Sequence, residues 1–433
     1  MSVTTPPRDR VHPRASAVAM LCGVALLAGA MQPQASDWPQ FLGPTRNGIY
    51  PGTNLAPAWP KDGPPVVWQK AVGQGYSGPV VARGKLILFH RRGGEEIVEA
   101  LDARDGRPLW AFPYPTSHVD QYPSGDTGPR GTPAVEDGRV FTFGAEGRLH
   151  CLDLSTGAKL WAVDGKRQFG ARPGFFGLAC SPLVDGDAVF VNVGGPGGAG
   201  VVAFDKVTGR VLWQSNDEEA SYSSPVAATL GGRRLAVFLT RGNLRGYETK
   251  SGRQAFEFPF MPPIQASVTA STPLVAGDAI FITASYDLGA AVLRVTPRGL
   301  EKLWADDDTL SSQYASVVGR GGFIYGVHGR LDVGQSSLRC VELATGRVRW
   351  SRDGLAYGTP ILAGDSLLYL MVNGELLRAA ASPDAFKELG RAQVLPLSAR
   401  AHPALADGLF YARSKDKLFC VDLRAPTVGA KKP

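Results

Sequence analysis

Six polar side chains in this sequence recur at one position of a repeated motif, in which Ser or Thr and then Pro precede an apolar run. Each stands three residues before the proline position. Arginine pairs with anionic groups and tyrosine donates hydrogen bonds, so such residues gathered at one level can bind an anionic or sugar-like small molecule or a peptide segment. The alternative is that they hydrogen-bond one another and channel water. The six residues are Tyr76, Arg130, Tyr222, Gln313, Tyr357 and Arg400.

The motif that would position these side chains occurs eight times. Each copy continues into an apolar strand that is interrupted by a glycine-containing turn, which is typical of a half-buried β-hairpin. Successive copies are 43 to 54 residues apart, and the proline positions are Pro79, Pro133, Pro182, Pro225, Pro273, Ser316 (a degenerate copy), Pro360 and Pro403.

Most repeats end in a second hairpin that an aromatic residue closes. In VVAFDKVTGRVLW an apolar strand ends at Asp205, Thr208 and Gly209 form a turn, and the next strand ends at Trp213. Asp can bond nearby backbone N–H groups in such a turn, and the large indole can pack on the neighbouring repeat. The predicted docking residues are Trp68, Trp110, Trp161, Trp213, Phe256, Trp304 and Trp350.

A period near 45 residues with room for four strands predicts a β-propeller. The chain is therefore expected to be all-β, with residues 66–424 forming a single eight-bladed propeller of four-stranded blades. The last repeat stops at KLFCVDL without a closing Trp, whereas an unattached strand with Trp68 precedes the first repeat. We expect the strand 66–72 to complete the eighth blade and thereby to close the ring.

The ends of the chain differ from the repeats. Residues 1–30 combine a basic start with an apolar run and the small residues Ala28-Gly29-Ala30, which predicts an export signal; an uncleaved membrane anchor is the alternative. Residues 31–65 are rich in Pro and Gly and are expected to form an extended segment that wraps the propeller. Residues 425–433 are expected to be a disordered tail.

Other candidates favour structural roles. His118 and Asp120 lie in the longest insertion, where a His-x-Asp pair can bind metal, but a solvated loop is the simpler interpretation. Cys151, Cys340 and Cys420 share one strand position and are expected to be small buried residues, so we predict no metal site. A net charge of +7 without a basic run before the tail does not predict a nucleic-acid partner.

The repeated Ala-Leu-Asp-x-x-x-Gly-[Lys/Arg]-x-x-Trp pattern resembles the tryptophan-docking repeat of pyrroloquinoline-quinone (PQQ) propellers over nearly all of residues 66–423. The resemblance implies one of two branches. Quinoprotein alcohol and glucose dehydrogenases carry PQQ and Ca²⁺ on the propeller axis, whereas PQQ-like propellers such as the lipoprotein BamB lack the cofactor. The chain has neither the adjacent cysteines of the first branch nor a visible copy of its Glu, Asn and Asp motif.

We therefore predict an exported, non-catalytic propeller, periplasmic or extracellular, that is a protein-interaction scaffold or ligand-binding module of the cell envelope. No catalytic residue and no cofactor is expected under this hypothesis. The expected partner is a protein or envelope component, with a small polar ligand in the channel as a further option. A membrane is involved only if the N-terminal segment stays uncleaved. The alternatives are a PQQ- and Ca²⁺-dependent oxidoreductase and a carbohydrate-binding propeller.

Overall fold

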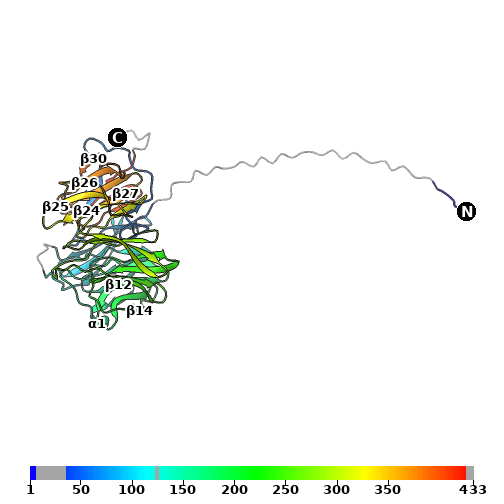
Figure 1. Ribbon diagram of the computed structural model, residues 1–433, viewed down its shortest axis with the longest axis horizontal. Coiled ribbons are helices and arrows are strands. Elements are labelled where there is room, and N and C mark those ends of the chain that lie inside the picture. The colour runs from blue at the N-terminus through cyan, green and yellow to red at the C-terminus, as the bar shows by residue number, and fades with distance from the viewer. Residues whose placement is uncertain (6–35, 122–125, 426–433) are drawn as a thin grey trace. The chain divides into compact units, whose positions relative to one another are not determined.

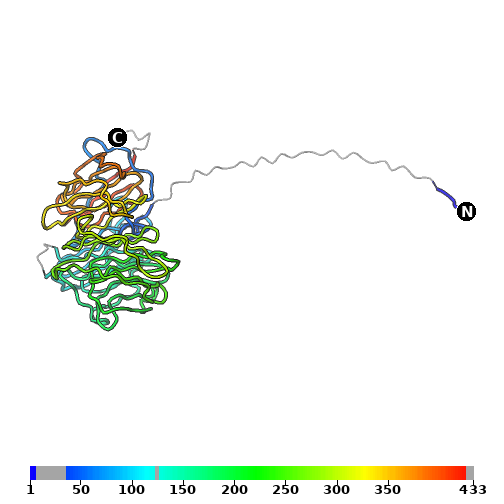
Figure 2. Tube along the Cα trace, in the orientation of Figure 1, coloured from blue at the N-terminus to red at the C-terminus, as the bar shows by residue number. Residues whose placement is uncertain are grey.

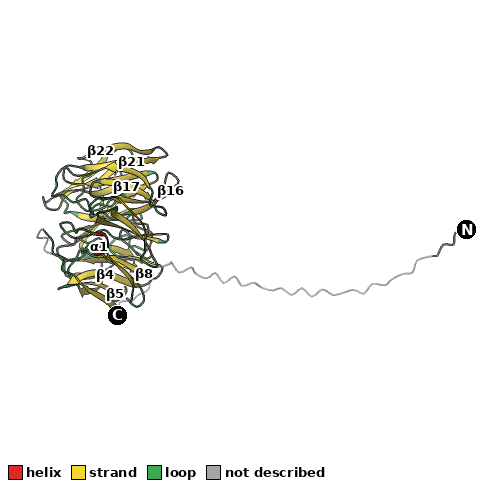
Figure 3. Cartoon of the chain, turned by 90° about the horizontal axis from the view of Figure 1, so that it is seen from below, coloured by secondary structure: helices red, strands yellow, loops and turns green. Residues whose placement is uncertain are grey.

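The computed structural model describes residues 1–5, 36–121 and 126–425. The compact unit spans Ala35–Pro433. The predicted signal (1–30) and tail (425–433) lie outside the described residues, apart from residues 1–5 and 425. Within the compact unit the described chain is almost entirely β-strand, and its one helix is the short α1 (Gly165–Phe169), capped by Asp164 (Figure 3).

Eight sheets form the blades, each built mainly from consecutive antiparallel strands (Figure 1). Blade 1 comprises β3 (Val80–Ala82), β4 (Lys85–Arg92), β5 (Glu95–Asp102) and β6 (Pro108–Pro115), and blade 2 comprises β7 (Ala134–Glu136), β8 (Arg139–Phe143), β9 (Arg148–Asp153) and β10 (Lys159–Asp164). Blade 3 comprises β11 (Leu183–Asp185), β12 (Ala188–Gly195), β13 (Ala199–Asp205) and β14 (Val211–Ser215), and blade 4 comprises β15 (Val226–Leu230), β16 (Arg233–Leu239), β17 (Asn243–Glu248) and β18 (Gln254–Pro259). Blade 5 comprises β19 (Leu274–Ala276), β20 (Ala279–Ala284), β21 (Gly289–Thr296) and β22 (Gly299–Asp306), and blade 6 comprises β23 (Val318–Arg320), β24 (Phe323–Arg330), β25 (Gln335–Glu342) and β26 (Val348–Asp353). Blade 7 comprises β27 (Gly358–Ala363), β28 (Ser366–Met371), β29 (Glu375–Ala380) and β30 (Glu388–Gln393), and blade 8 comprises β31 (Ala404–Ala406), β32 (Leu409–Arg413), β33 (Lys417–Asp422) and β2 (Val66–Ala71).

The predicted eight-bladed propeller is confirmed, and so is the closure of its ring. Strand β2 pairs antiparallel with β33, so the eighth blade takes its outer strand from the N-terminal side of the repeats. First strands of neighbouring blades contact one another, as β3 does with β7 and with β31, which identifies the first strand of each blade as the innermost. Closure leaves no blade short of a strand and hides a sheet edge.

The Ser/Thr-Pro motif builds a belt of hydrogen bonds around the axis. In blades 1 to 5 the backbone N–H of the residue before the proline donates to the hydroxyl of the equivalent residue in the next blade, as Thr132 does to Ser181 at 2.9 Å and Ser181 does to Ser224 at 2.9 Å. The chain of bonds runs from Gly78 through Thr132, Ser181, Ser224 and Thr272 to Ser316. Proline follows every member except Ser316, and it fits there because its position needs no donor in this belt.

Blade 6 corrects one detail of the predicted register. Ser316 was assigned to the proline position, but its hydroxyl accepts the N–H of Thr272 at 3.1 Å and so belongs to the belt. In the other blades except blade 7 the innermost strand begins directly after the proline, and β23 begins at Val318. Val317 therefore occupies the proline position, one residue later than predicted. The prediction was wrong here because an apolar residue beside an apolar strand does not mark the motif.

Six tryptophans join neighbouring blades through their indole N–H groups. Trp161, for example, donates to Lys206 O at 3.2 Å, and its ring lies against Gly209 in the turn of the next blade. Phe256 has no such donor and packs over Gly246 of its own blade. The other donor and acceptor pairs are Trp68 to Ala103, Trp110 to Leu154, Trp213 to Thr249, Trp304 to Leu343 and Trp350 to Ser382.

We expect Gly209→Ala to lower the free energy of unfolding by about 2–4 kcal/mol, because a methyl group would strain the backbone and overlap the ring of Trp161. Gly209 has φ +73°, and an added Cβ would lie 2.7 Å from the Trp161 ring. Gly232, with φ +75° and no atom within 4 Å of such a Cβ, is the matched control. Gly232→Ala should cost only about 1 kcal/mol. Equal urea midpoints for the two variants would contradict a role for the indole contact.

The segment before the propeller, residues 36–59, lies across its axis; we call it the axial segment. Trp38 forms an antiparallel bridge with Val81 of blade 1. Further along, β1 (Ile49–Tyr50) pairs parallel with β27 of blade 7. Between these points the buried Arg46 donates to the carbonyls of Ser181 (2.8 Å), Pro182 (3.0 Å) and Pro225 (2.7 Å) in blades 3 and 4. In Figure 2 this blue segment lies among the orange and red strands of the last blades.

The end of the axial segment replaces a docking residue that blade 7 lacks. Gly390 of β30 stands where other blades carry tryptophan, and the Trp59 ring lies 3.6 Å from the position of its missing Cβ. The carbonyl of Leu423, equivalent to the acceptors of the indole bonds, accepts the backbone N–H of Ala56 at 2.8 Å. The junction between blades 7 and 8 is therefore completed by residues from outside the repeats.

Candidate functional site

One mouth of the propeller axis contains a cavity of about 710 Å³. Its walls are the loops that precede the innermost strands, so we call the eight positions three residues before each proline position the collar. Phe41 of the axial segment also lines the cavity and packs edge-on to His402. Of the predicted axial residues, the cavity is lined by Tyr76, Arg130, Tyr222, Gln313 and Arg400.

Tyr357, the sixth predicted residue, does not line the cavity. It is buried, and its hydroxyl accepts the backbone N–H groups of Tyr314 (2.9 Å) and Ala315 (3.0 Å). The Tyr357 ring lies 4.6 Å from that of Tyr314. With the corrected register of blade 6, Tyr314 rather than Gln313 occupies the collar position there, and Tyr314 does line the cavity. Tyr357 thus supports the loop that carries Tyr314.

Arg130 is held in place by the long insertion of blade 1. Its guanidinium pairs with Asp120 at 2.8 Å, and Asp120 in turn contacts His118 Nε2 at 2.9 Å. The guanidinium also lies over the rings of Tyr76 (5.1 Å) and Phe176 (4.9 Å). Both His118 and the Asp120 side chain are buried, so the insertion fixes the orientation of an arginine in the wall; its residues 122–125 lie outside the described part of the chain.

Tyr222 fixes the adjoining part of the wall in a similar way. Its hydroxyl accepts the backbone N–H of Phe176 at 3.2 Å, and the two rings lie 5.9 Å apart. Burial raises the pKa of Tyr222, so its hydroxyl is neutral at physiological pH. Tyr222 therefore contributes an aromatic surface whose hydroxyl is already engaged.

The third arginine of the cavity, Arg330, was not predicted because no repeat position marks it. Arg330 pairs with Asp332 and lies 4.3 Å from the centre of the Tyr286 ring. Gln313 Nε2 donates to the Tyr286 hydroxyl at 3.0 Å and to Asp332 at 3.1 Å. Arg330 lowers the pKa of Asp332, which keeps that carboxylate charged and paired. Gln313 thus bridges groups of the wall.

The remaining part of the wall contains polar atoms that no described residue satisfies. The Tyr314 hydroxyl and His402 Nε2 are buried and have no hydrogen-bond partner among the described residues. Burial lowers the pKa of His402 to about 4, so the imidazole is neutral at pH 7. Arg400 lies over the Tyr76 ring at 5.4 Å, and no ion pair joins it to a carboxylate of the described residues. These three side chains line the same cavity, and we call them together the Arg400 corner.

The residues of the cavity do not fit the Ca²⁺ ion of quinoproteins. Calcium takes six to eight oxygen ligands, several of them carboxylates. The lining contains three arginines and one carboxylate, Asp332, which is already paired with Arg330. No group of three or more His, Cys, Asp or Glu side chains among the described residues is placed to hold a metal ion. A cation would therefore meet a wall of the same charge.

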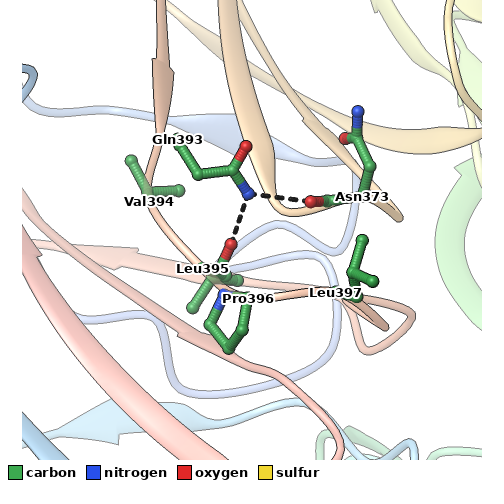
Figure 4. A pocket seen from close by; sticks show the side chains of 6 residues that line it. All are labelled: Asn373, Gln393, Val394, Leu395, Pro396 and Leu397. Atoms are coloured by element: carbon green, nitrogen blue, oxygen red, sulfur yellow. Dashed lines mark hydrogen bonds between the residues drawn. The ribbon is translucent and has the colours of Figure 1, made fainter.

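A surface depression and the cysteines offer less. The depression in Figure 4 is lined by apolar residues and by Gln393, whose Nε2 donates to Asn373 O (2.8 Å) and Leu395 O (2.5 Å). Its amide donors are thus already used. The cysteines of the described residues, Cys151, Cys180, Cys340 and Cys420, are buried free thiols. Among the helices of the described residues none has the length and apolarity needed to cross a membrane.

Comparison with known proteins brings two groups of relatives. The model of the PQQ_2 family, described as outer membrane protein assembly factor BamB, matches residues 94–352. The quinoprotein alcohol dehydrogenase PedH of Pseudomonas putida is 25% identical over 40% of this chain and 29% of its own length. BamB of Burkholderia pseudomallei is 27% identical over 42% of this chain and 43% of its own length. The matches thus span less than half of either curated relative.

The solved structure of BamB from Moraxella catarrhalis has the same fold. It superimposes with a TM-score of 0.60 and 16% sequence identity, and the match covers 85% of this chain and 99% of that chain. At a sequence identity of 16% this similarity shows a shared fold alone.

Proposed function

Because the chain belongs to the PQQ_2 family, described as outer membrane protein assembly factor BamB, we propose that it is an exported, non-catalytic propeller that binds a protein partner of the cell envelope. The collar face is the proposed interface. It belongs to a ring in which every blade is braced by its neighbours, so the loops that carry it are held in fixed positions.

The observation that carries this proposal is the chemistry of the collar. Tyrosine, phenylalanine and arginine are enriched at protein interfaces, where they anchor a partner in desolvated pockets. Here the collar residue Arg130 lies over the rings of Tyr76 and of Phe176 in the adjoining loop, Tyr222 packs on Phe176, and Asp120 balances the charge of Arg130. The carboxylates beside the cavity, Asp120 and Asp332, each pair with an arginine, which suits recognition better than proton transfer.

The test is co-purification from the envelope. A tagged full-length chain should recover outer-membrane assembly components after mild cross-linking, and the double variant Phe176→Ala/Tyr222→Ala should recover them at least tenfold less efficiently, because hot-spot aromatics each contribute about 2 kcal/mol or more. Leu160→Ala, on the exposed outer strand β10, is the matched control and should recover them normally. Equal recovery by the collar variant would rule out this face, and no recovery by the wild type would contradict the proposal.

Export is part of the same proposal and has its own measurement. The family description names an assembly factor of outer membrane proteins, and residues 1–30 carry the predicted signal. Mass spectrometry of the protein from the periplasmic fraction should show an N-terminus near residue 31 if the signal is cleaved. An intact Met1 in the cytoplasmic fraction would contradict export.

The quinoprotein relatives favour a second candidate, a PQQ-dependent oxidoreductase. Titration of the purified protein with PQQ, with and without Ca²⁺, followed by dye-coupled oxidation assays, separates the two candidates. Saturable micromolar binding with turnover of alcohols or sugars would replace the scaffold proposal. Absence of turnover with bound PQQ would leave the scaffold in place and identify the cavity as a binding site.

A further inference from the structure

We infer that the Arg400 corner is a binding site for a small hydroxycarboxylate, a ligand whose carboxylate has a hydroxyl group close to it. This site goes beyond the proposed protein interface, because it is defined by unpartnered polar groups of the cavity wall rather than by the aromatic residues around Arg130. Hydroxy acids and sugar acids share the required chemistry.

Arg400 supplies the charge that selects an anion. The other two arginines of the cavity, Arg130 and Arg330, are each paired with a carboxylate. Arg400 has no such pair among the described residues, and its guanidinium lies 5.4 Å from the centre of the Tyr76 ring. A planar guanidinium stacked on an aromatic face keeps its edge available for a bidentate carboxylate.

Tyr314 supplies a neutral donor. Its hydroxyl is buried, is without a partner among the described residues, and lies in the same cavity wall. Burial raises the pKa of Tyr314 well above its usual value, and Arg400 is close enough to influence the same group. A carboxylate bound by Arg400 would give this O–H group an acceptor, which removes the cost of leaving it unpaired.

His402 supplies an acceptor, and this distinguishes a hydroxycarboxylate from a simple carboxylate. Its Nδ1 lies 3.2 Å from the carbonyl oxygen of Pro403, which can only accept, so Nδ1 carries the proton. Nε2 is then a bare acceptor; it has no partner among the described residues and lies in a side chain that is 8% exposed. The ligand that satisfies it must present an O–H or N–H group beside its carboxylate.

The carbon skeleton of the ligand has an apolar surface to lie on. Phe41 packs edge-on to His402 with ring centres 5.4 Å apart, and Tyr76 lies on the Arg400 side. Acetate would pair with Arg400 and Tyr314 and leave Nε2 unsatisfied, whereas a neutral sugar would leave Arg400 unpaired. The expected order of affinity is therefore hydroxycarboxylate, then plain carboxylate, then neutral sugar.

Calorimetric titration of the mature protein at pH 7 with glycolate, galacturonate, acetate and galactose tests this order. We expect saturable binding of glycolate, galacturonate or both, at least about fivefold tighter than acetate, and none of galactose. Stronger binding of glycolate identifies a small hydroxy acid, and stronger binding of galacturonate identifies a sugar acid. Equal affinity for acetate and glycolate would overturn the inference, because the hydroxyl group of the ligand would then contribute nothing. Saturation by none of the acids would also overturn it, because channel water alone would then fill the corner.

Variants tie the binding to the corner. Arg400→Gln should weaken binding about tenfold or more, because it removes a charged hydrogen-bonding partner, and should leave the melting temperature unchanged because Arg400 is exposed. Tyr314→Phe should weaken binding several-fold because it removes a donor to the ligand. It should leave the melting temperature unchanged, since the lost hydroxyl has no structural partner among the described residues. The matched control, Tyr357→Phe, removes a hydroxyl that holds the backbone and should lower the melting temperature instead.

A spectroscopic readout separates ligand contact from folding. The ¹⁵N shift of His402 Nε2 should move on addition of the ligand, because an acceptor nitrogen gains a hydrogen bond, while that of Nδ1 should change little. Binding that persists undiminished in Arg400→Gln, or a ligand-saturated sample with an unmoved Nε2 resonance, would overturn the inference. Neither result depends on whether an envelope partner is found.

Discussion

Arg46→Ala is expected to lower the free energy of unfolding by about 3 kcal/mol, because it removes a buried side chain that is bonded to several parts of the ring. The guanidinium is 5% exposed and donates to the carbonyls of Ser181, Pro182 and Pro225. Burial lowers the pKa of Arg46 to about 10, so it remains charged at pH 7. Loss of its donors leaves buried carbonyl groups without partners, and the axial segment loses its contact with blades 3 and 4.

Two controls and two measurements make this result specific. Arg298→Ala removes an exposed arginine and should change stability by no more than about 0.5 kcal/mol. Arg46→Lys keeps the charge but offers fewer directed donors, so its urea midpoint should lie between those of the wild type and Arg46→Ala. Limited proteolysis should cut residues 50–65 faster in Arg46→Ala. If the urea midpoint and the cutting rate of Arg46→Ala both match those of Arg298→Ala, Arg46 does not hold the axial segment in place.

The repeats were predictable because each blade repeats the same physical solution. An apolar strand, a glycine turn and an aromatic residue recur at fixed positions, so the period and the closing strand at Trp68 follow from the pattern. The collar followed from the same periodicity, since equivalent residues of a ring lie at one level. The single slip occurred where Val317 replaces proline, because an apolar residue beside an apolar strand carries no positional signal.

The axial segment was not predictable in the same way, because its contacts are not repeated. Arg46 bonds to carbonyls that are 135 to 179 residues away in sequence, and nothing in its own neighbourhood identifies them. One signal was nevertheless present. Blade 7 has Gly390 where a tryptophan is expected, while Trp59 stands outside every repeat. In other propellers, a repeat that lacks its aromatic residue can be compared with any tryptophan outside the repeats, because the second residue can replace the first.

The chemistry of the collar was also predictable only in part. The type of each collar residue can be read from the sequence, but whether it is available depends on its neighbours in space. Asp120 neutralises Arg130, and the hydroxyl of Tyr357 is used by the backbone of the next loop, whereas Arg400 has no carboxylate partner among the described residues. The distinction between a bracing residue and a binding residue therefore required the packed ring.

Acidification is expected to destabilise the propeller between about pH 6.5 and pH 4, before most of its carboxylates titrate. His150 and His402 are buried, and burial lowers the pKa of each to about 4 from an ordinary value of 6.5. The folded state then binds fewer protons than the unfolded state within this window, so stability falls as the pH falls. Each histidine can remove up to about 3 kcal/mol at pH 4.

The buried and paired carboxyl groups change stability in other directions or at lower pH, so the contribution of the two histidines can be measured separately. Burial raises the pKa of Glu96, whose protonation favours the folded state and partly opposes the loss. The pKa of Asp205 is lowered by its bonds to Thr208, so its contribution is lost only as the pH falls below about 4. Urea midpoints measured from pH 7 to pH 4.5 should therefore fall steeply in the wild type and less steeply in His150→Gln/His402→Gln. Because glutamine cannot be protonated, an equally steep fall in the double variant would show that other groups drive the acid transition.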